Sequence, residues 1–74
     1  MKNLVELIVK ELVDEDTNVV VTKQLDDGEM LINIEVDDSQ KGKVIGKNGK
    51  IINSIRTIAK ACAIKEDVKV TIKI

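Results

Sequence analysis

The segment Val44-Ile45-Gly46-Lys47-Asn48-Gly49-Lys50-Ile51-Ile52 guides the interpretation of the rest of this 74-residue sequence. Two glycines, Gly46 and Gly49, bracket a polar pair, and apolar residues flank them on both sides. Glycines so placed allow positive φ angles and the close approach of a ligand. The pattern predicts a tight loop between a short helix and a longer one.

Outward from this loop, the spacing of apolar residues predicts a helix on each side. The helix that begins after Gly49 carries an apolar stripe formed by Ile51, Ile52, Ile55, Ile58, Ala59 and Cys62. On the other side, Asp37-Asp38-Ser39 offers N-caps for a short helix from about Ser39 to Ile45. Gly46 should end that helix.

Three further segments have the pattern of β-strands. Residues 18–25 contain a β-branched run, and residues 30–36 and 68–74 alternate between apolar and other side chains. Between the first two strands, Asp26-Asp27-Gly28-Glu29 contains an Asp-Gly pair, which is typical of a hairpin turn. We therefore expect the first two strands to pair through this turn.

The N-terminal segment predicts one more helix. Its apolar stripe consists of Leu4, Val5, Ile8, Val9 and Leu12. Asn3 and Glu6 have the spacing of a capping box, and the helix should end around Glu15-Asp16. The resulting order, α-β-β-α-α-β, predicts a two-layer α+β fold: a three-stranded sheet with helices packed on one face. At this length, residues 1–74 are expected to form a single domain.

The composition excludes most kinds of catalysis. The chain has no His, Phe, Tyr or Trp and a single Cys. Without His, neither a Ser–His–Asp triad nor a His-ligated metal can form, and one Cys allows no internal disulfide. We therefore expect no enzyme activity, no metal and no cofactor. A lone thiol is typical of a cytoplasmic setting, and the absence of an apolar run of roughly 20 residues argues against a membrane partner.

Charge is distributed unevenly along the chain, although the formal net charge is only −1. Residues 1–40 carry 11 acidic and 3 basic side chains, whereas residues 41–65 carry 7 basic side chains and no acidic one. The near-neutral total therefore conceals a basic stretch around the glycine loop. An anionic partner is expected to bind there.

The glycine loop has the properties of a phosphate-binding element. It leads into the N-terminus of the long helix, where free backbone N–H groups and the helix dipole favour an anion. Lys47 and Asn48 at its tip are the strongest candidates for direct contact. Lys43, Lys50 and Arg56 are expected to attract or contact phosphates.

The glycine spacing alone also has other interpretations. An ordinary corner between two helices, with glycine only as a C-cap, would have the same glycine spacing. A Walker A loop fits poorly, because Gly42 to Gly46 is one residue short and Asn48 stands where Ser or Thr would bind magnesium.

Residues 44–56 closely resemble the signature of the KH domain, hydrophobic-Ile-Gly-x-x-Gly-x-x-Ile, and the element order is similar to type II KH topology. The whole chain looks like the small single-KH-domain RNA-binding proteins of bacteria, the KhpA family. The resemblance implies that a GxxG loop clamps the backbone of single-stranded RNA. By position, the clamp comprises Gly46, Lys47, Asn48 and Gly49. The apolar floor on which bases would rest comprises Val44, Ile45 and Ile52.

The resemblance also implies partners and a role. Single-stranded RNA is the expected ligand, with an RNA chaperone or post-transcriptional regulator as the expected role. A homodimer is favoured, and a heterodimer with another KH-containing protein is also expected to be possible. The alternative is a protein-interaction or scaffold module in which the GxxG loop is vestigial. The absence of aromatic residues does not exclude RNA, because bases can pack on aliphatic side chains.

Overall fold

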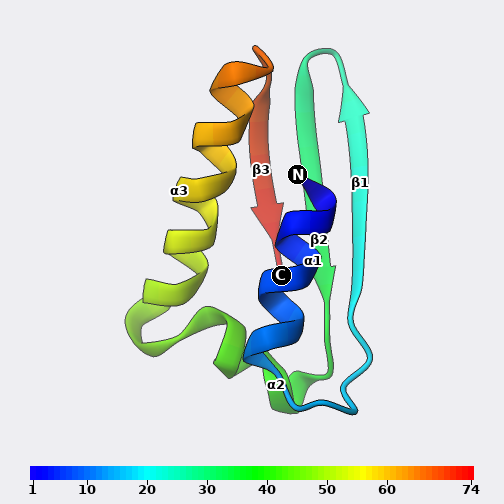
Figure 1. Ribbon diagram of the computed structural model, residues 1–74, viewed down its shortest axis with the longest axis vertical. Coiled ribbons are helices and arrows are strands. Elements are labelled where there is room, and N and C mark those ends of the chain that lie inside the picture. The colour runs from blue at the N-terminus through cyan, green and yellow to red at the C-terminus, as the bar shows by residue number, and fades with distance from the viewer.

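The computed structural model describes all 74 residues. Three α-helices, a short 3-10 helix and three strands follow one another along the chain (Figure 1). Their bounds are α1 Lys2–Leu12, β1 Val20–Asp26, β2 Glu29–Glu35, α2 Asp38–Ile45, η1 Lys47–Gly49, α3 Lys50–Lys65 and β3 Lys69–Lys73. The predicted order α-β-β-α-α-β is confirmed.

The sheet has the order β1-β2-β3, with β2 in the centre. β1 and β2 are antiparallel and pair Asp26 with Glu29 next to the turn. That turn contains Asp27 and Gly28, whose φ angles of 52° and 79° are both positive, as a two-residue hairpin turn requires. β3 runs parallel to β2 and pairs Ile72 with Ile32.

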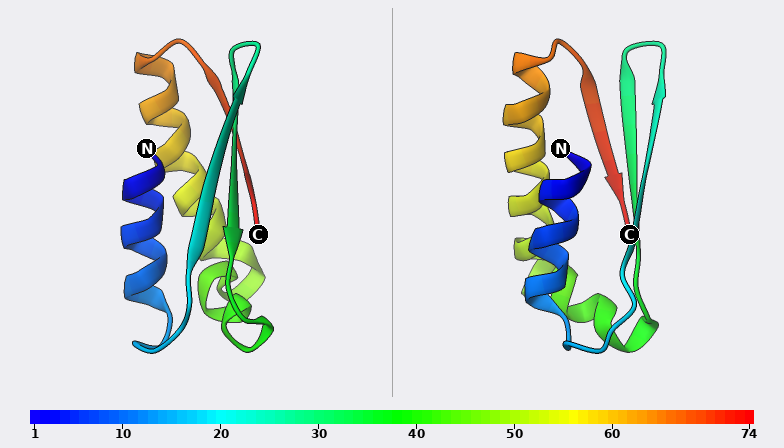
Figure 2. Two further views of the ribbon diagram at one scale, coloured as in Figure 1. Left: turned by 90° about the vertical axis from the view of Figure 1, so that its right-hand side faces the viewer. Right: turned by 45° about the vertical axis from the view of Figure 1, so that its right-hand side comes forward.

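The helices pack on one face of the sheet, which confirms the two-layer architecture (Figure 2). Between the layers lies an aliphatic core with no aromatic residue. Its members are Val5, Val9, Val21, Met30, Ile32, Ile34, Val44, Ile52, Ile55, Ala59 and Ile72. Ile32 and Ile34 on the central strand are almost completely buried, because α1 and α3 cover that face of the sheet.

Two details of α1 differ from the prediction. The capping box is wrong: the helix begins at Lys2, no side chain caps it, and Glu6 forms an ion pair with Lys10 at 2.9 Å instead. The predicted end near Glu15-Asp16 is also wrong, because α1 ends at Leu12. Val13 adopts an extended backbone that turns the chain toward β1 while its side chain packs against the core.

Candidate nucleic-acid interface

The glycine loop is a tight turn in which three of four residues have positive φ angles. Gly46 has φ 77° and ψ 172°, Asn48 has φ 58°, and Gly49 has φ 74°. Asparagine is one of the few residues with a side chain that tolerates this left-handed region. The sequence Gly-Lys-Asn-Gly therefore suits the backbone of this turn and holds Lys47 and Asn48 at its tip.

The loop delivers backbone donors at the start of α3. No side chain caps this helix at Gly49, and its first turn contains no acidic residue. The first N–H groups of an α-helix have no partner within the helix, and they lie at the positive end of its dipole. Within the loop, the Gly49 N–H donates to the Gly46 carbonyl and the Lys50 N–H to the Lys47 carbonyl. An anion placed against this turn would therefore meet the N–H groups that follow in the first turn of α3, together with the side chains of Lys47 and Lys50.

The basic side chains of residues 41–65 fall into two groups. Two of them are in ion pairs: Lys41 contacts Asp38 at 3.2 Å, and Lys43 contacts Asp14. The side chains from the loop onward, which include Lys47, Lys50 and Lys60, form no ion pair. Positive charge that carboxylates leave uncompensated therefore begins at the glycine loop and continues along α3.

Lys43 belongs to a small polar network that ties α2 to the segment after α1. Gln40 is buried; its Oε1 accepts from the Asp14 backbone N–H and its Nε2 donates to Asp14 Oδ2, both at 3.1 Å. Lys43 Nζ donates to Asp14 Oδ1. The hydrogen bond and the charge of Lys43, with a smaller contribution from Gln40, lower the pKa of Asp14. The network fixes the position of α2, and the sequence analysis did not identify Gln40.

The lowered pKa of Asp14 predicts an acid-dependent contribution to stability. Its carboxylate stabilises the fold above the ordinary pKa of about 3.9, and this contribution disappears as the pH falls through the lower folded-state value. Asp14→Asn should therefore lose less stability than the wild type between neutral and strongly acidic pH. Thermal unfolding across that range measures the difference. Asp16→Asn, which removes an unpaired carboxylate nearby, should follow the wild-type profile; equal profiles for all three proteins would contradict the expectation.

The residues expected to form the apolar floor lie mostly in the core. Val44 is 0% exposed and Ile52 is 4% exposed, and Ile45 is half-buried. The expectation for Val44 and Ile52 therefore needs correction, since neither offers a surface to a base. The physical reason is that both side chains are members of the aliphatic core.

A partly accessible groove lies elsewhere, between α3 and the edge of β3, where Val70 is half-buried and Ile72 belongs to the core. A cavity of about 180 Å³ in this position is lined by Arg56, Lys60, Val70, Thr71 and Ile72. A second cavity shares Lys60, Val70 and Thr71, so the two form one groove along the strand. We call it the α3–β3 groove. Sequence reasoning found only Arg56 among these residues, although Lys60 follows at helical spacing on the same face.

Asn53 lies beside the glycine loop, and hydrogen bonds of Arg56 link it to this groove. A Cβ placed on Gly49 would lie 3.6 Å from Asn53 Nδ2, and Arg56 Nη1 donates to Asn53 Oδ1 at 3.2 Å. Arg56 Nη2 also donates to the backbone carbonyl of Ile72 at 3.2 Å. Arg56 therefore joins α3 to β3 at the end of the groove that lies nearer the loop.

The outer edge of β3 supplies unpaired backbone groups to the groove. β3 pairs only with β2, so its other edge has no neighbouring strand. The Ile72 carbonyl points to this edge, since it accepts from Arg56. Backbone groups alternate in direction along a strand, so those of Val70 point the same way. The polar edges of a ligand in the groove would therefore meet the backbone groups of Val70 and Ile72.

Comparison with known proteins gives the family. The sequence model described as "KhpA/KhpB, KH domain" matches residues 2–74. The chain belongs to the KhpA/KhpB family of KH domains. A Clostridium perfringens protein named RNA-binding protein KhpA is 46% identical over all 74 residues and 99% of its own length. Proteins of that name from Clostridium acetobutylicum and Listeria monocytogenes are 40% and 38% identical to the chain over all 74 residues. These matches cover 99% and 97% of the relatives' own lengths. No solved structure matches the chain.

Membership of the KhpA/KhpB family agrees with the expected type of protein. The relatives carry the name of an RNA-binding protein and not that of an enzyme, and they come from bacteria. None of the three α-helices has the length and apolar character needed to cross a membrane. The family assignment and the α+β fold confirm the resemblance stated from residues 44–56.

Proposed function

We propose that this chain binds single-stranded RNA without catalysing a reaction, and that the loop Gly46–Gly49 clamps the phosphate backbone. One observation carries the proposal: a glycine loop with unpaired lysines and helix N–H donors lies next to an open groove between α3 and β3. The names of the KhpA relatives support RNA as the ligand. The loop supplies the phosphate contacts, and the groove accepts the bases.

The positions of the lysines suggest the path of the bound RNA. Lys47 and Lys50 lie at the loop, and Lys60 lies on the groove side of α3; none of them is in an ion pair. Phosphates would follow these lysines, while the bases would turn toward the edge of β3. KH domains hold about four nucleotides, which matches a path from the loop along part of α3. Lys43, by contrast, is engaged with Asp14 and contributes at most long-range attraction.

The double variant Lys47→Asp/Asn48→Asp tests the clamp. The second substitution suits the loop, because Asp tolerates the left-handed conformation of Asn48 almost as well as Asn does. The first replaces an exposed side chain whose φ angle is not positive. We expect the affinity for a labelled single-stranded RNA to fall about tenfold or more, and the salt dependence to become shallower by about one phosphate contact or more. Fluorescence anisotropy at two salt concentrations measures both quantities, with circular dichroism as the control for folding.

The chain contains its own matched control, since Lys2-Asn3 repeats the dipeptide of the loop tip at the start of α1. Lys2→Asp/Asn3→Asp makes the same change of net charge far from the loop, and acidic residues are favourable at a helix N-terminus. This variant should bind RNA within about twofold of the wild type. Equal losses in the two variants would assign the effect to total charge; a folded loop variant that binds as tightly as the wild type would refute the clamp.

We further propose that the chain acts in the cytoplasm as an RNA chaperone or post-transcriptional regulator, and that it works as a homodimer. The helix layer supports a dimer, because Leu4, Leu7 and Ile58 are exposed there. Two linked sites would raise the avidity for one RNA. Sedimentation of the isolated chain measures its oligomeric state. A purely monomeric chain would leave a heterodimer with another KH-containing protein as the arrangement to test. If RNA binding fails altogether, a protein-interaction module becomes the better reading.

A further inference from the structure

The far end of the α3–β3 groove forms a cavity that the proposed clamp does not use. Its volume is about 390 Å³, and it lies where α3 ends and β3 begins. One side is apolar and includes Ile64, Val68 and Val70, while the other side carries Glu29 and Lys69. A cavity with aliphatic walls and a few polar groups is typical of a site for a flat, partly polar ligand.

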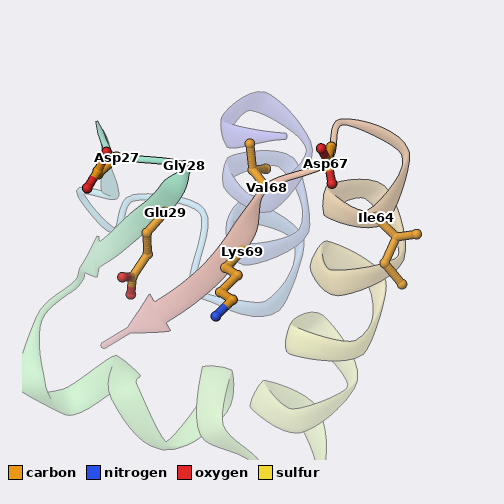
Figure 3. Close-up of a pocket in the computed structure, with 7 residues that line it drawn as sticks. All are labelled: Asp27, Gly28, Glu29, Ile64, Asp67, Val68 and Lys69. Carbon is orange, nitrogen blue, oxygen red and sulfur yellow. The ribbon is translucent and has the colours of Figure 1, made fainter.

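Ile64 is the most unusual part of the apolar wall. It is 79% exposed, which is the highest value among the large hydrophobic side chains of the chain. Figure 3 shows Ile64 on the α3 side of β3 and Glu29 on the β2 side, with Lys69 between them. In a chain without aromatic residues, an exposed aliphatic side chain at the mouth of the cavity offers a surface for the face of a nucleobase.

The polar side of the cavity combines one negative and one positive group. Glu29 and Lys69 are direct partners in the register of β2 and β3, yet no ion pair forms between them. Glu29 Oε1 instead accepts a long hydrogen bond of 3.5 Å from the Thr71 hydroxyl. Both charged groups are therefore available to a ligand. Asp27 and Asp67 line the adjoining cavity (Figure 3), so a phosphate is disfavoured at this end.

We propose that this distal cavity binds a single nucleobase, and that Glu29 selects bases with an exocyclic amino group over uracil. The proposal rests on the proposed function, because the glycine loop must bring the RNA to the groove. The base packs on Ile64. Glu29 accepts from its amino group, and Lys69 donates to a ring nitrogen or carbonyl oxygen. Lys60, which lines the same cavity, attracts the phosphate that precedes the base.

The chemistry of the bases gives the direction of the selection. Cytosine, adenine and guanine each present an amino donor next to an acceptor, which matches a carboxylate beside an ammonium group. Uracil has one N–H in the same region, and it lies between two carbonyl oxygens that the carboxylate repels. Cytosine and uracil have rings of the same size, so a comparison of these two isolates the amino group.

The test compares the binding of hexacytidine and hexauridine at neutral pH, because homopolymers remove any question of register. We expect the wild type to bind hexacytidine about fivefold more tightly, at the low end of the effect of one base-edge contact. Glu29→Gln should bring the two affinities within about twofold, since an amide both donates and accepts. Glu35→Gln, which removes the same charge at the other end of β2, should keep the wild-type ratio.

A second pair of variants tests the apolar wall. Ile64→Ser should weaken the binding of hexacytidine about threefold or more, whereas Leu25→Ser, at another exposed aliphatic position on β1, should not. A wild-type ratio near one, or a ratio that Glu29→Gln leaves unchanged, would overturn the proposal. If the wild type binds RNA and Lys47→Asp/Asn48→Asp weakens it, such a result refutes the distal site alone. If no RNA binds, the proposed function fails first.

Discussion

Gly46→Ala is expected to lower the free energy of unfolding by about 3 kcal/mol or more. The φ of 77° and ψ of 172° at Gly46 belong to a region that is essentially confined to glycine. A Cβ at this position would lie 2.6 Å from Ile51 Cγ1 and 2.9 Å from Ile51 Cβ. Since Ile51 Cβ is attached directly to the backbone, the clash is relieved only by moving the first turn of α3.

Such a loss is large for a chain of this size, whose total stability is expected to be roughly 4–11 kcal/mol. Urea unfolding followed by circular dichroism measures it. Gly42→Ala is the matched control, because Gly42 lies within α2 and a Cβ there meets nothing within 4 Å. Alanine is the better helix former by about 0.5–1 kcal/mol, so this variant should be more stable than the wild type. Similar urea midpoints for Gly46→Ala and Gly42→Ala would show that the loop does not require glycine at position 46.

Ile52→Ala is the second large effect, with an expected loss of about 2–5 kcal/mol. Ile52 is 4% exposed and belongs to the core beneath α3. The substitution leaves a cavity between the helix layer and the sheet, and the aliphatic neighbours fill it only in part. Urea unfolding again measures the loss of stability. The RNA affinity is measured separately, at a urea concentration low enough to keep the variant fully folded.

The control for Ile52→Ala lies three turns further along the same helix. Ile64→Ala removes the same atoms from an exposed position and should change the stability by no more than about 0.5 kcal/mol. The pair separates two roles for the aliphatic residues of α3. If Ile52→Ala kept full stability but lost RNA affinity, Ile52 would be part of the base floor, as its place in the KH signature implies, and its assignment to the core would be wrong.

Much of the fold could be predicted because its signals are local. The alternation of residues 30–36 and the Asp-Gly pair at Asp27-Gly28 depend only on neighbouring residues, and both produced the expected strand and turn. The apolar stripe of α3 was also sufficient to identify the helix. The ends of elements were less predictable. α1 ends at Leu12, and the extended Val13 that follows packs on a core whose strands lie far along the sequence.

Of the candidate site, only the glycine loop could be predicted from the sequence. Glycine spacing and adjacent lysines identified the loop, since the loop is continuous in sequence. The ion pair of Lys43 with Asp14 joins residues 29 positions apart, and no pattern near Lys43 indicates it. The groove likewise depends on the packing of α3 beside β3, so Val70 and Thr71 could not be assigned to it beforehand. Motif position also placed Val44 at a binding surface, whereas the direction of α2 places it in the core.

The parallel pairing of β2 with β3 has a consequence for the order in which the molecule is built. A parallel partner requires both helices of the crossover to be in place first, and closing so long a connection is entropically slow. The hairpin of β1 and β2, by contrast, closes through two residues and needs nothing downstream. Because β3 follows the glycine loop along the chain, this wall of the groove is synthesised after the loop. The hairpin and the glycine loop therefore precede the strand that completes the groove.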